Sequence, residues 1–450
     1  MDLLIVCLSG IAFYLAARIL FAKPSRSLPP GPSGWPIIKN FFDVPSHQAW
    51  LAYAELGRKY GEVSSLNVLG TPMIILNSAK GASNILDKNS AISSDRPQFV
   101  MGNELCGWKD VVTFMQNGDR LRQARKSFHR ELGTKSSLSS FYPIQEEETR
   151  KFLARVLKAP ECLADHIRKT AGAIILKISH GYTIREGSDP FVDMADRSMM
   201  NFSTVATPGA YLVDFIPALQ YLPEWFPGAG FQRDAERYRK ELLESAMVPH
   251  QFVLDEMAKG DYVPSFTSKL LEDGVTPEEE KSIMWNSLTM YLGGSDTIVS
   301  TICAFFLAMT IHPDIQRRAQ AELDAVIGTG RLPTFDDRDS LPGILHDETS
   351  YPDPETFNPD RYLGENPQPD PRNHCFGYGR RICAGMDLAE GSFFIAVAMS
   401  LAVLEISRCI ENGVEIIPKL ELMDGVVSRP RPFKCKITPR SAKAKDLVYV

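Results

Sequence analysis

The sequence predicts a mainly helical fold with small β-sheets, preceded by an N-terminal transmembrane helix. Apolar residues recur with helical spacing from about Gln48 to Gly328, and two short strand candidates, Val63–Leu66 and Pro72–Leu76, interrupt the pattern. Leu3–Phe21 is an almost unbroken apolar run, and about 20 such residues span a bilayer. With 450 residues, of which 44% are hydrophobic, the chain can bury a large core.

The N-terminal apolar run is predicted to be a membrane anchor. Arg18 is its one charge, and its aliphatic stem lets the guanidinium reach the interface. Asp2 precedes the run, whereas a cleaved signal peptide, which is the alternative, usually begins with a basic segment. Lys23 and Arg26 follow the run, which places the rest of the chain on the cytoplasmic side by the positive-inside rule.

The chain divides into three parts. Residues 1–21 form the anchor, residues 22–47 form a proline-rich hinge, and residues 48–450 form one large domain. Within the hinge, Leu28–Pro36 is too rich in proline to be helical. The eight cysteines are scattered without a C-x-x-C pair, which fits reduced thiols in a cytosol-facing protein. A net charge of −6 argues against a nucleic-acid partner.

The best-marked helix begins at Thr276. Thr276 as N-cap, Pro277 at the first helical position and Glu279 two residues later make a capping box, and the helix is expected to run to about His312. Gly293 and Gly294 lie inside it, and each glycine weakens a helix by about 1 kcal/mol relative to alanine. Close packing against a neighbouring helix is one explanation for this pair, and a functional opening of the helix is the other.

Phe376–Gly385 reads F-x-x-G-x-R-x-C-x-G, and each fixed position has a chemical reason. Cys383 supplies a thiolate, which can bind haem iron from one face. Gly379 and Gly385 suit a tightly folded backbone, because glycine tolerates positive φ and close approach. Arg381 carries a guanidinium that matches a haem propionate. The stretch therefore predicts a haem site with Cys383 as the iron ligand.

An apolar run, Met386–Leu404, follows the cysteine directly and predicts a helix. The positive end of that helix would help to hold the Cys383 sulfur as a thiolate. The alternative is that Cys383 is an ordinary buried free cysteine. The complete set of fixed positions favours the haem ligand.

The motif resembles the haem-ligand loop of the cytochrome P-450 family, and the resemblance covers nearly the whole chain. It implies the cytochrome P-450 fold and haem b as the cofactor. It also implies that Cys383 binds the metal and that the cofactor is held by the other motif residues Phe376, Gly379, Arg381 and Gly385.

Two further segments are similar to family signatures. Gly293–Thr297 matches the signature of the central helix, where the family's helix opens locally beside bound dioxygen. This resemblance implies that Asp296 and Thr297 carry proton delivery. Arg125 ends a segment in the place of the family's W-x-x-x-R helix, with Leu121 where tryptophan is usual, so Arg125 is expected to reach a haem propionate.

The resemblance also implies a function. The amino-acid sequences of Ser340–Pro342, Tyr351–Pro354 and Phe376–Arg381 look closest to those of basidiomycete fungal members, a branch that includes enzymes of secondary metabolism. It implies a monooxygenase that inserts one oxygen atom from O2 into an apolar small molecule of terpenoid, polyketide or indole type. NADPH-cytochrome P-450 reductase would deliver electrons, with cytochrome b5 as an optional second donor. The expected location is the endoplasmic reticulum membrane, single-pass, with the catalytic domain in the cytosol.

One segment of the family is missing. Tyr351–Tyr362, which includes Arg361, resembles the meander before the haem loop. Between the central helix and this meander the family carries an E-x-x-R helix, whose glutamate and arginine pair with the meander arginine, and strands that floor the substrate pocket. In this chain the stretch that ends at Pro342 is followed at once by the stretch that begins at Gly343, and the family has these two stretches well apart. The fold is therefore expected to be incomplete around the E-x-x-R helix, the K-helix region.

The apparent deletion at 342/343 has two open explanations. A wrongly spliced gene model or transcript dropped the segment, or the chain is a real but crippled variant. Removing the partners of a buried charge such as Arg361 costs about 3–5 kcal/mol, a large part of a typical stability of about 5–15 kcal/mol. Two other functions therefore stay open: an impaired or inactive haem-binding protein, and a non-haem scaffold in which Cys383 is incidental.

Overall fold

The structure is a computed structural model that describes residues 9–10, 27–36, 38–45, 47–207, 209–340, 357–362 and 367–449. The chain forms two compact units. The smaller unit comprises residues 1–93 together with Tyr378–Arg380, and the larger unit comprises residues 94–377 and 381–450. Of the predicted site residues, Gly379 belongs to the smaller unit and all the others belong to the larger one.

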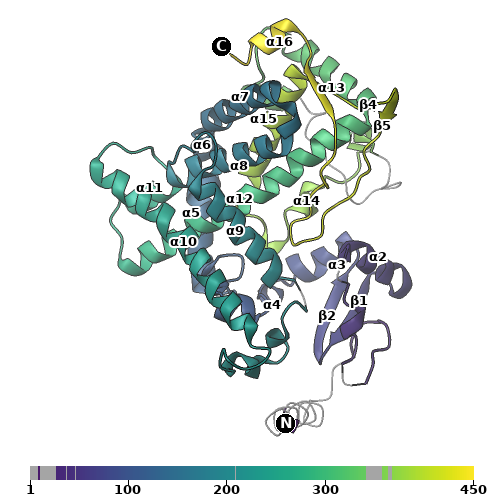
Figure 1. The fold of residues 1–450 in the computed structure, drawn as a ribbon, viewed down its shortest axis with the longest axis vertical. Helices are drawn as coiled ribbons and strands as arrows, with labels where there is room; N and C mark the ends of the chain where they lie inside the picture. Colours follow the sequence, from purple (N-terminus) through teal and green to yellow (C-terminus); the bar gives the residue numbers. More distant parts are fainter. Residues whose placement is uncertain are drawn as a thin grey trace. The chain divides into compact units, whose positions relative to one another are not determined.

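The smaller unit is built on a two-stranded antiparallel sheet of β1 (Val63–Val68) and β2 (Thr71–Leu76), which confirms both predicted strands. The turn between them holds Leu69 and Gly70 at positive φ (51° and 86°), as two-residue hairpin turns require. Helix α2 (Ala49–Tyr60) packs against the sheet (Figure 1). Its short helical turns are η1 (Phe41–Asp43), α3 (Ala79–Ala82), η2 (Ser83–Asp87) and α4 (Ser90–Ser93).

The larger unit is mainly helical. Its helices of ten or more residues are α5 (Asp119–Leu132), α7 (Tyr142–Lys158), α8 (Leu163–His180), α9 (Pro190–Val205), α10 (Gly230–Lys259), α12 (Pro277–Ile311), α13 (Pro313–Val326) and α15 (Met386–Val403). Shorter helical segments connect them: η3 (Val100–Leu105), η4 (Trp108–Asp110), α6 (Lys135–Ser139), η5 (Pro160–Cys162), η6 (Leu212–Asp214), η7 (Pro217–Tyr221), α11 (Phe266–Leu271), η8 (Phe335–Ser340), η10 (Pro359–Tyr362), α14 (Arg372–Cys375), η11 (Gly379–Arg381, shared between the units) and α16 (Ala442–Asp446).

Helix α12 is the longest helix of the larger unit and lies against α8, α9, α10 and α15 (Figure 1). Its predicted capping box is confirmed: Thr276 Oγ1 accepts from the Glu279 N–H at 3.3 Å, and Glu279 Oε2 accepts from the Thr276 N–H at 2.9 Å. Helix α15 begins at Met386, directly after the haem-loop motif, as the sequence predicted. The Tyr291 side chain, on the inner side of α12, is 1% exposed.

Two small antiparallel sheets complete the larger unit. Strand β3 (Leu404–Ser407) pairs with β6 (Lys436–Pro439), and β4 (Cys409–Glu411) pairs with β5 (Val414–Ile416). The predicted class, mainly α with small β-sheets, is therefore confirmed for the described part of the chain, and it is consistent with the cytochrome P-450 fold.

Two described helices, α12 and α15, are long and apolar enough to cross a membrane by length and composition. Their most apolar stretches are 44% and 67% buried, however, which is the behaviour of core helices. Apart from Ser9 and Gly10, the predicted anchor lies outside the described residues. The anchor therefore stays a prediction.

The predicted junction at 342/343 and Tyr351–Thr356 lie outside the described residues, whereas the end of the meander is described. Arg318 on α13 binds Asp360 with two hydrogen bonds, at 3.0 and 2.6 Å. Arg361 donates to the Asn358 carbonyl at 3.0 Å and to Gln368 Oε1 at 3.2 Å. Asp360 thus joins this segment to α13, and the Arg361 contacts link residues 358, 361 and 368 to one another.

Candidate functional site

A cavity of about 580 Å³ lies inside the larger unit, which is the size range of small-molecule and cofactor sites. It is lined by α5, α8, α12, α15 and residues of the segments 371–376 and 381–385. Most of its wall is apolar, with contributions from Val112, Leu121, Phe128, Leu132, Ile175, Met290, Ile298, Leu388 and Phe393. Such a wall suits a flat apolar cofactor and an apolar substrate.

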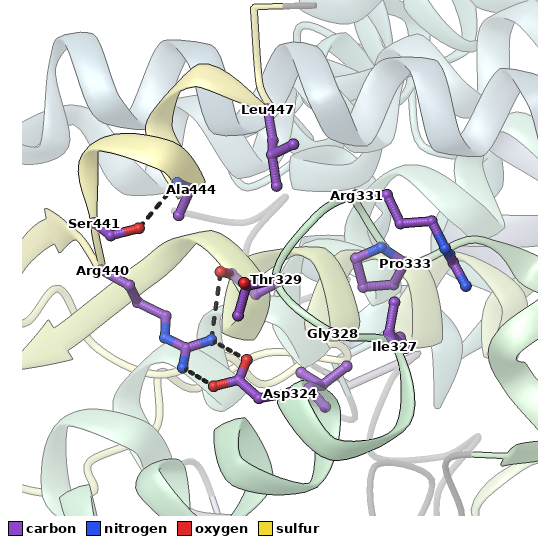
Figure 2. Close-up of a pocket in the computed structure, with 12 residues that line it drawn as sticks. Asp324, Ile327, Gly328, Thr329, Arg331, Pro333, Arg440, Ser441, Ala444 and Leu447 are labelled. Carbon is purple, nitrogen blue, oxygen red and sulfur yellow. Dashed lines mark hydrogen bonds and ion pairs between the residues drawn. The ribbon is translucent and has the colours of Figure 1, made fainter.

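A second cavity, of about 190 Å³, lies near α13 and α16 (Figure 2). Its charged groups already satisfy one another. Arg440 binds Asp324 at 3.0 and 2.6 Å, and Arg331 binds Asp337 at 2.7 and 2.6 Å. The size and the paired charges indicate a structural role, and the larger cavity is the candidate site.

Cys383 lies on the wall of the larger cavity with its neighbours Ile382 and Ala384. Cys383 is an exposed residue that borders the cavity. Burial raises the pKa of the thiol, and a hydrogen bond from the Gly385 N–H and the charge of Arg125 act in the opposite direction. The Cys383 N–H donates to the Phe376 carbonyl at 2.8 Å, which folds the loop back on itself.

Four arginines line the same cavity. Arg372 is paired with Asp370 and Glu390, and the other three are Arg96, Arg125 and Arg381. The side-chain hydrogen bonds of these three go to backbone carbonyls: Arg96 to Thr113 at 3.1 Å, Arg125 to Ile382 at 2.8 Å, and Arg381 to Ser94 at 2.7 Å and to Met115. Burial lowers the pKa of Arg381 to about 10, with the charges of Arg96 and Arg125 acting in the same direction.

These observations test whether the residues fit haem b. Cys383 is one sulfur ligand in an apolar cavity, and the three guanidiniums are donors that carboxylates would neutralise through charge-assisted hydrogen bonds. The donor set therefore fits an iron porphyrin with two propionates. Arg96 was not predicted from the sequence, because nothing in its local sequence distinguishes it from a surface arginine.

The motif glycines differ in their reasons. Gly379 has φ +53°, and its N–H donates to Asp87 Oδ1 at 2.6 Å. A Cβ at Gly379 would lie 2.4 Å from the Leu86 carbonyl oxygen, so the close approach demands glycine. Gly385 lines the cavity but has an ordinary φ of −103°, and a Cβ there would meet nothing within 4 Å. Positive φ and close approach to protein atoms therefore explain Gly379, whereas the expected close approach of Gly385 to the cofactor stays a prediction.

The two glycines of α12 also divide between the two explanations. A Cβ at Gly294 would lie 2.5 Å from Ile175 Cδ1, so Gly294 allows α12 to approach α8 closely. A Cβ at Gly293 would meet nothing within 4 Å, although both glycines border the cavity. Thr297 also lines the cavity, and its hydroxyl donates to the Gly293 carbonyl at 2.7 Å. The helix is continuous here, so the expected local opening is not seen; the threonine instead bonds back one turn.

Asp296 is not among the residues that line the cavity. Its Oδ1 lies 3.7 Å from Arg429 Nη1, beside a second pair in which Arg168 Nε lies 3.7 Å from Asp196 Oδ2. Burial raises the pKa of Asp196, which the charge of Arg168 opposes. The structure thus places Thr297 in the cavity and Asp296 in a charged cluster beside it. Arg429 was another residue that the sequence did not reveal.

Comparison with known proteins supports this geometry. A model of the family described as cytochrome P-450 matches residues 29–343 and 340–437. Cytochrome P-450 monooxygenase claR of Ampulloclitocybe clavipes is 41% identical over 98% of this chain and 92% of its own length. Cytochrome P-450 monooxygenase 208 of Postia placenta is 39% identical over 99% and 98%, and CLM2 of Gibberella zeae is 37% identical over 100% and 96%.

The match to the family is broken at one place. The two matched pieces meet at residues 340–343, where the sequence predicted a junction. The alignment with claR runs over 494 positions, whereas 98% of a 450-residue chain is about 441 residues. About 53 aligned positions therefore have no counterpart in this chain.

The matches cover far more than half of the chain, and the relatives are named as monooxygenases. Haem b with a cysteine thiolate ligand is the family's cofactor, and its monooxygenases use dioxygen, redox partners and small-molecule substrates. The chain therefore belongs to the cytochrome P-450 family and is a haem-dependent monooxygenase by descent.

Proposed function

We propose that the site of this protein inserts one oxygen atom from O2 into an apolar small molecule of secondary metabolism, of terpenoid, polyketide or indole type. One observation carries the proposal: the thiol of Cys383 and a largely apolar wall share one cavity of about 580 Å³. When bound, haem b would supply the activation of dioxygen. The protein would position the substrate, deliver protons and exclude water.

The residues of the cavity have separable roles. Cys383 would bind the iron, and Arg96, Arg125 and Arg381 would hold the propionates. The Thr297 hydroxyl would serve as the proton donor, because Thr297 lines the cavity from α12. Asp296, one residue earlier, would bring protons to it from the charged cluster around Arg429.

The substrate class rests on the wall opposite the thiol loop. Ile175, Met290 and Ile298 give it an apolar surface, and besides Thr297 its α12 hydroxyls belong to Thr289 and Thr301. Thr289 already donates to the Trp285 carbonyl at 2.7 Å, and Thr301 to the Thr297 carbonyl at 3.0 Å. Recognition would therefore depend on shape and apolar contact more than on hydrogen bonds.

Substrate binding and turnover test this proposal. Apolar terpenoid, polyketide and indole compounds are titrated into the ferric protein, and displacement of iron-bound water is followed by the shift of the haem absorption to the high-spin form. One class is expected to give this shift, and its product is expected to carry one atom from isotopically labelled dioxygen. Label taken from water, or no oxygenated product, would contradict the proposal.

The electron donor and the location are part of the same proposal. NADPH-cytochrome P-450 reductase would deliver the electrons, with cytochrome b5 as a second donor, at the endoplasmic reticulum membrane. The apolar span Leu3–Phe21 followed by Lys23 and Arg26 supports a single-pass anchor with the domain in the cytosol. Protease added to intact microsomes should digest the domain, and a protected domain would exclude this topology.

A second candidate function is a haem-binding protein with impaired or no turnover. The break in the family match at residues 340–343 supports this candidate, because the sequence predicts the loss of the E-x-x-R segment at that place. The 450-residue chain is expected to retain haem weakly, and the same chain with the claR segment inserted after Pro342 should retain it well. If the chain as given forms a stable haem-thiolate protein and oxidises a substrate, the segment is dispensable and this candidate fails.

A further inference from the structure

Glu390 is a carboxylate of the cavity wall that the oxygen-insertion chemistry does not use. It lies on α15, seven residues after Cys383, and its side chain is 14% exposed. One oxygen, Oε2, accepts from two guanidiniums: Arg338 Nη2 at 2.9 Å and Arg372 Nη1 at 3.4 Å. This partly buried carboxylate holds two arginines together, because its removal would leave two cations facing each other.

Arg338 reaches Glu390 from an element that is itself held in place. It belongs to η8, whose first residue, Phe335, is 7% exposed. The Phe335 N–H donates to Glu146 Oε1 at 2.9 Å, and its ring stacks on Tyr142 with centroids 3.8 Å apart. Helices α7 and η8 therefore present Arg338 to Glu390 from a packed surface.

Arg372 reaches Glu390 from the start of the haem loop. Asp370 accepts from Arg372 Nε at 2.7 and 2.9 Å, and this hydrogen bonding raises the pKa of Arg372 above its usual value. Arg372 and Glu390 are 18 residues apart in the chain, and Cys383 lies between them. The ion pair therefore closes, at its base, the loop that carries the thiol.

The three residues come from both sides of the junction at 342/343. Arg338 precedes it by four residues, whereas Arg372 and Glu390 follow it. Through Arg338, 52 residues earlier, Glu390 contacts the part of the chain before the junction. Through Arg372, 18 residues earlier, it contacts the loop after the junction.

We propose that Glu390 is a positioning residue, which holds the Cys383 loop against the cavity by bridging Arg338 and Arg372. This role rests on the proposed function, in which the loop carries the iron ligand Cys383. The tie between Glu390 and the two arginines does not depend on haem, so it is tested first in the chain without added haem.

Amide hydrogen exchange of the 450-residue protein tests the tie. In Glu390→Gln, the amides of residues 372–389 should exchange about tenfold faster than in the parent, the size expected when charge-assisted hydrogen bonds are lost. Arg338→Met should have the same effect on this loop, although Arg338 is distant from it in sequence. Loop exchange equal to that of the parent in both variants would overturn the proposal.

Asp324→Asn is the matched control. It removes one carboxylate from an arginine pair at the C-terminal end of α15, the Arg440 pair drawn in Figure 2. The exchange of residues 372–389 should be unchanged in this variant. Faster loop exchange in Asp324→Asn would mean that the loop responds to any loss of stability, and Glu390 would have no special role.

A haem readout separates positioning from general stability. In haem-loaded protein with the segment restored, Glu390→Gln should increase the fraction of the ferrous–carbon monoxide complex that lacks thiolate ligation. Glu390→Asp should recover part of the thiolate-ligated fraction. An unchanged thiolate fraction in Glu390→Gln would contradict the positioning role. If the parent itself shows no thiolate ligation, the proposed function fails, whereas the exchange measurement still decides the tie.

Discussion

At the scale of single side chains, the neighbouring residues Asp296 and Thr297 of α12 have different surroundings. Thr297 lines the cavity and donates to the Gly293 carbonyl at 2.7 Å, whereas Asp296 faces Arg429 at 3.7 Å. Consecutive residues on a helix point about 100° apart, so one can face the cavity while the other faces a charged cluster. This arrangement supports a proton path that enters at Asp296 and ends at Thr297.

Replacing Thr297 by alanine should uncouple turnover in the chain with the segment restored. Product per NADPH should fall by about 100-fold, because a positioned proton donor contributes on that order, and the electrons should appear as peroxide. Thr297→Ser keeps the hydroxyl and serves as the control. The measurement is the ratio of product and peroxide to NADPH consumed; unchanged coupling in Thr297→Ala would refute the role.

Arg96 should be needed for haem retention. Arg96→Gln removes one of the four guanidiniums that line the cavity. A hydrogen bond to a charged group contributes about 1.5–3 kcal/mol, so haem should dissociate at least about tenfold faster. Arg122→Gln is the control, because Arg122 is exposed and pairs with Asp119 on α5. The measurement is the rate of haem transfer to an acceptor apoprotein. Equal rates for Arg96→Gln and the parent would remove Arg96 from the site.

At the scale of elements, the helices with strong local signals were the ones the sequence predicted well. Thr276 and Pro277 start α12, and Pro313 follows its end, so the bounds are written in the chain itself. The short segments η3 and η8 carry no such signals. Their helical form depends on contacts with distant residues, such as the Tyr142 ring that stacks on Phe335, and a local pattern cannot report these contacts.

The capping box of α12 should contribute measurably to stability. Thr276→Ala removes the side-chain acceptor of the Glu279 N–H and should lower the free energy of unfolding by about 1 kcal/mol. Thr276→Ser keeps the acceptor and should behave as the parent. Urea denaturation measures the difference; a midpoint for Thr276→Ala that matches the parent would show that the cap is not formed.

At the scale of the whole molecule, the sequence predicted the site better than its surroundings. Cys383, Phe376, Arg381 and Gly385 share one motif, and the cavity brings Arg125 to them from α5. Other residues reach the same cavity or its border from separate elements, with no shared spelling, and were not predicted: Arg96, Arg429 and Glu390. Their positions follow from packing of the entire larger unit, which a local pattern does not encode.

Buried histidines should make the whole fold sensitive to mild acid. Burial lowers the pKa of His180 from 6.5 to about 3, and burial also lowers the pKa of His250. Above pH 6.5 both histidines are neutral in the folded and in the unfolded chain, so the protein has its full free energy of unfolding. Below pH 6.5 the unfolded chain takes up protons that the folded chain does not. The free energy of unfolding therefore falls, with a slope that approaches about 1.4 kcal/mol per pH unit for His180, and His250 acts in the same direction.

Urea denaturation between pH 6.5 and 5 measures this slope. His180→Gln should flatten it, because one proton fewer is then taken up on unfolding. The variant is compared with the parent by slope and not by absolute stability, since the His180 ring is also packed at the edge of Tyr291. Parallel slopes in the two proteins would show that His180 is protonated equally in both states.

The central claim is that Cys383 is the thiolate ligand of a haem in this cavity. The ferrous–carbon monoxide difference spectrum tests it most directly, in the chain with the segment restored and in its Cys383→Ala variant. The account predicts the thiolate-type band in the first protein and its complete loss in the second, with a smaller thiolate fraction in the 450-residue chain as it stands. A thiolate-type band that survives in Cys383→Ala would contradict the account.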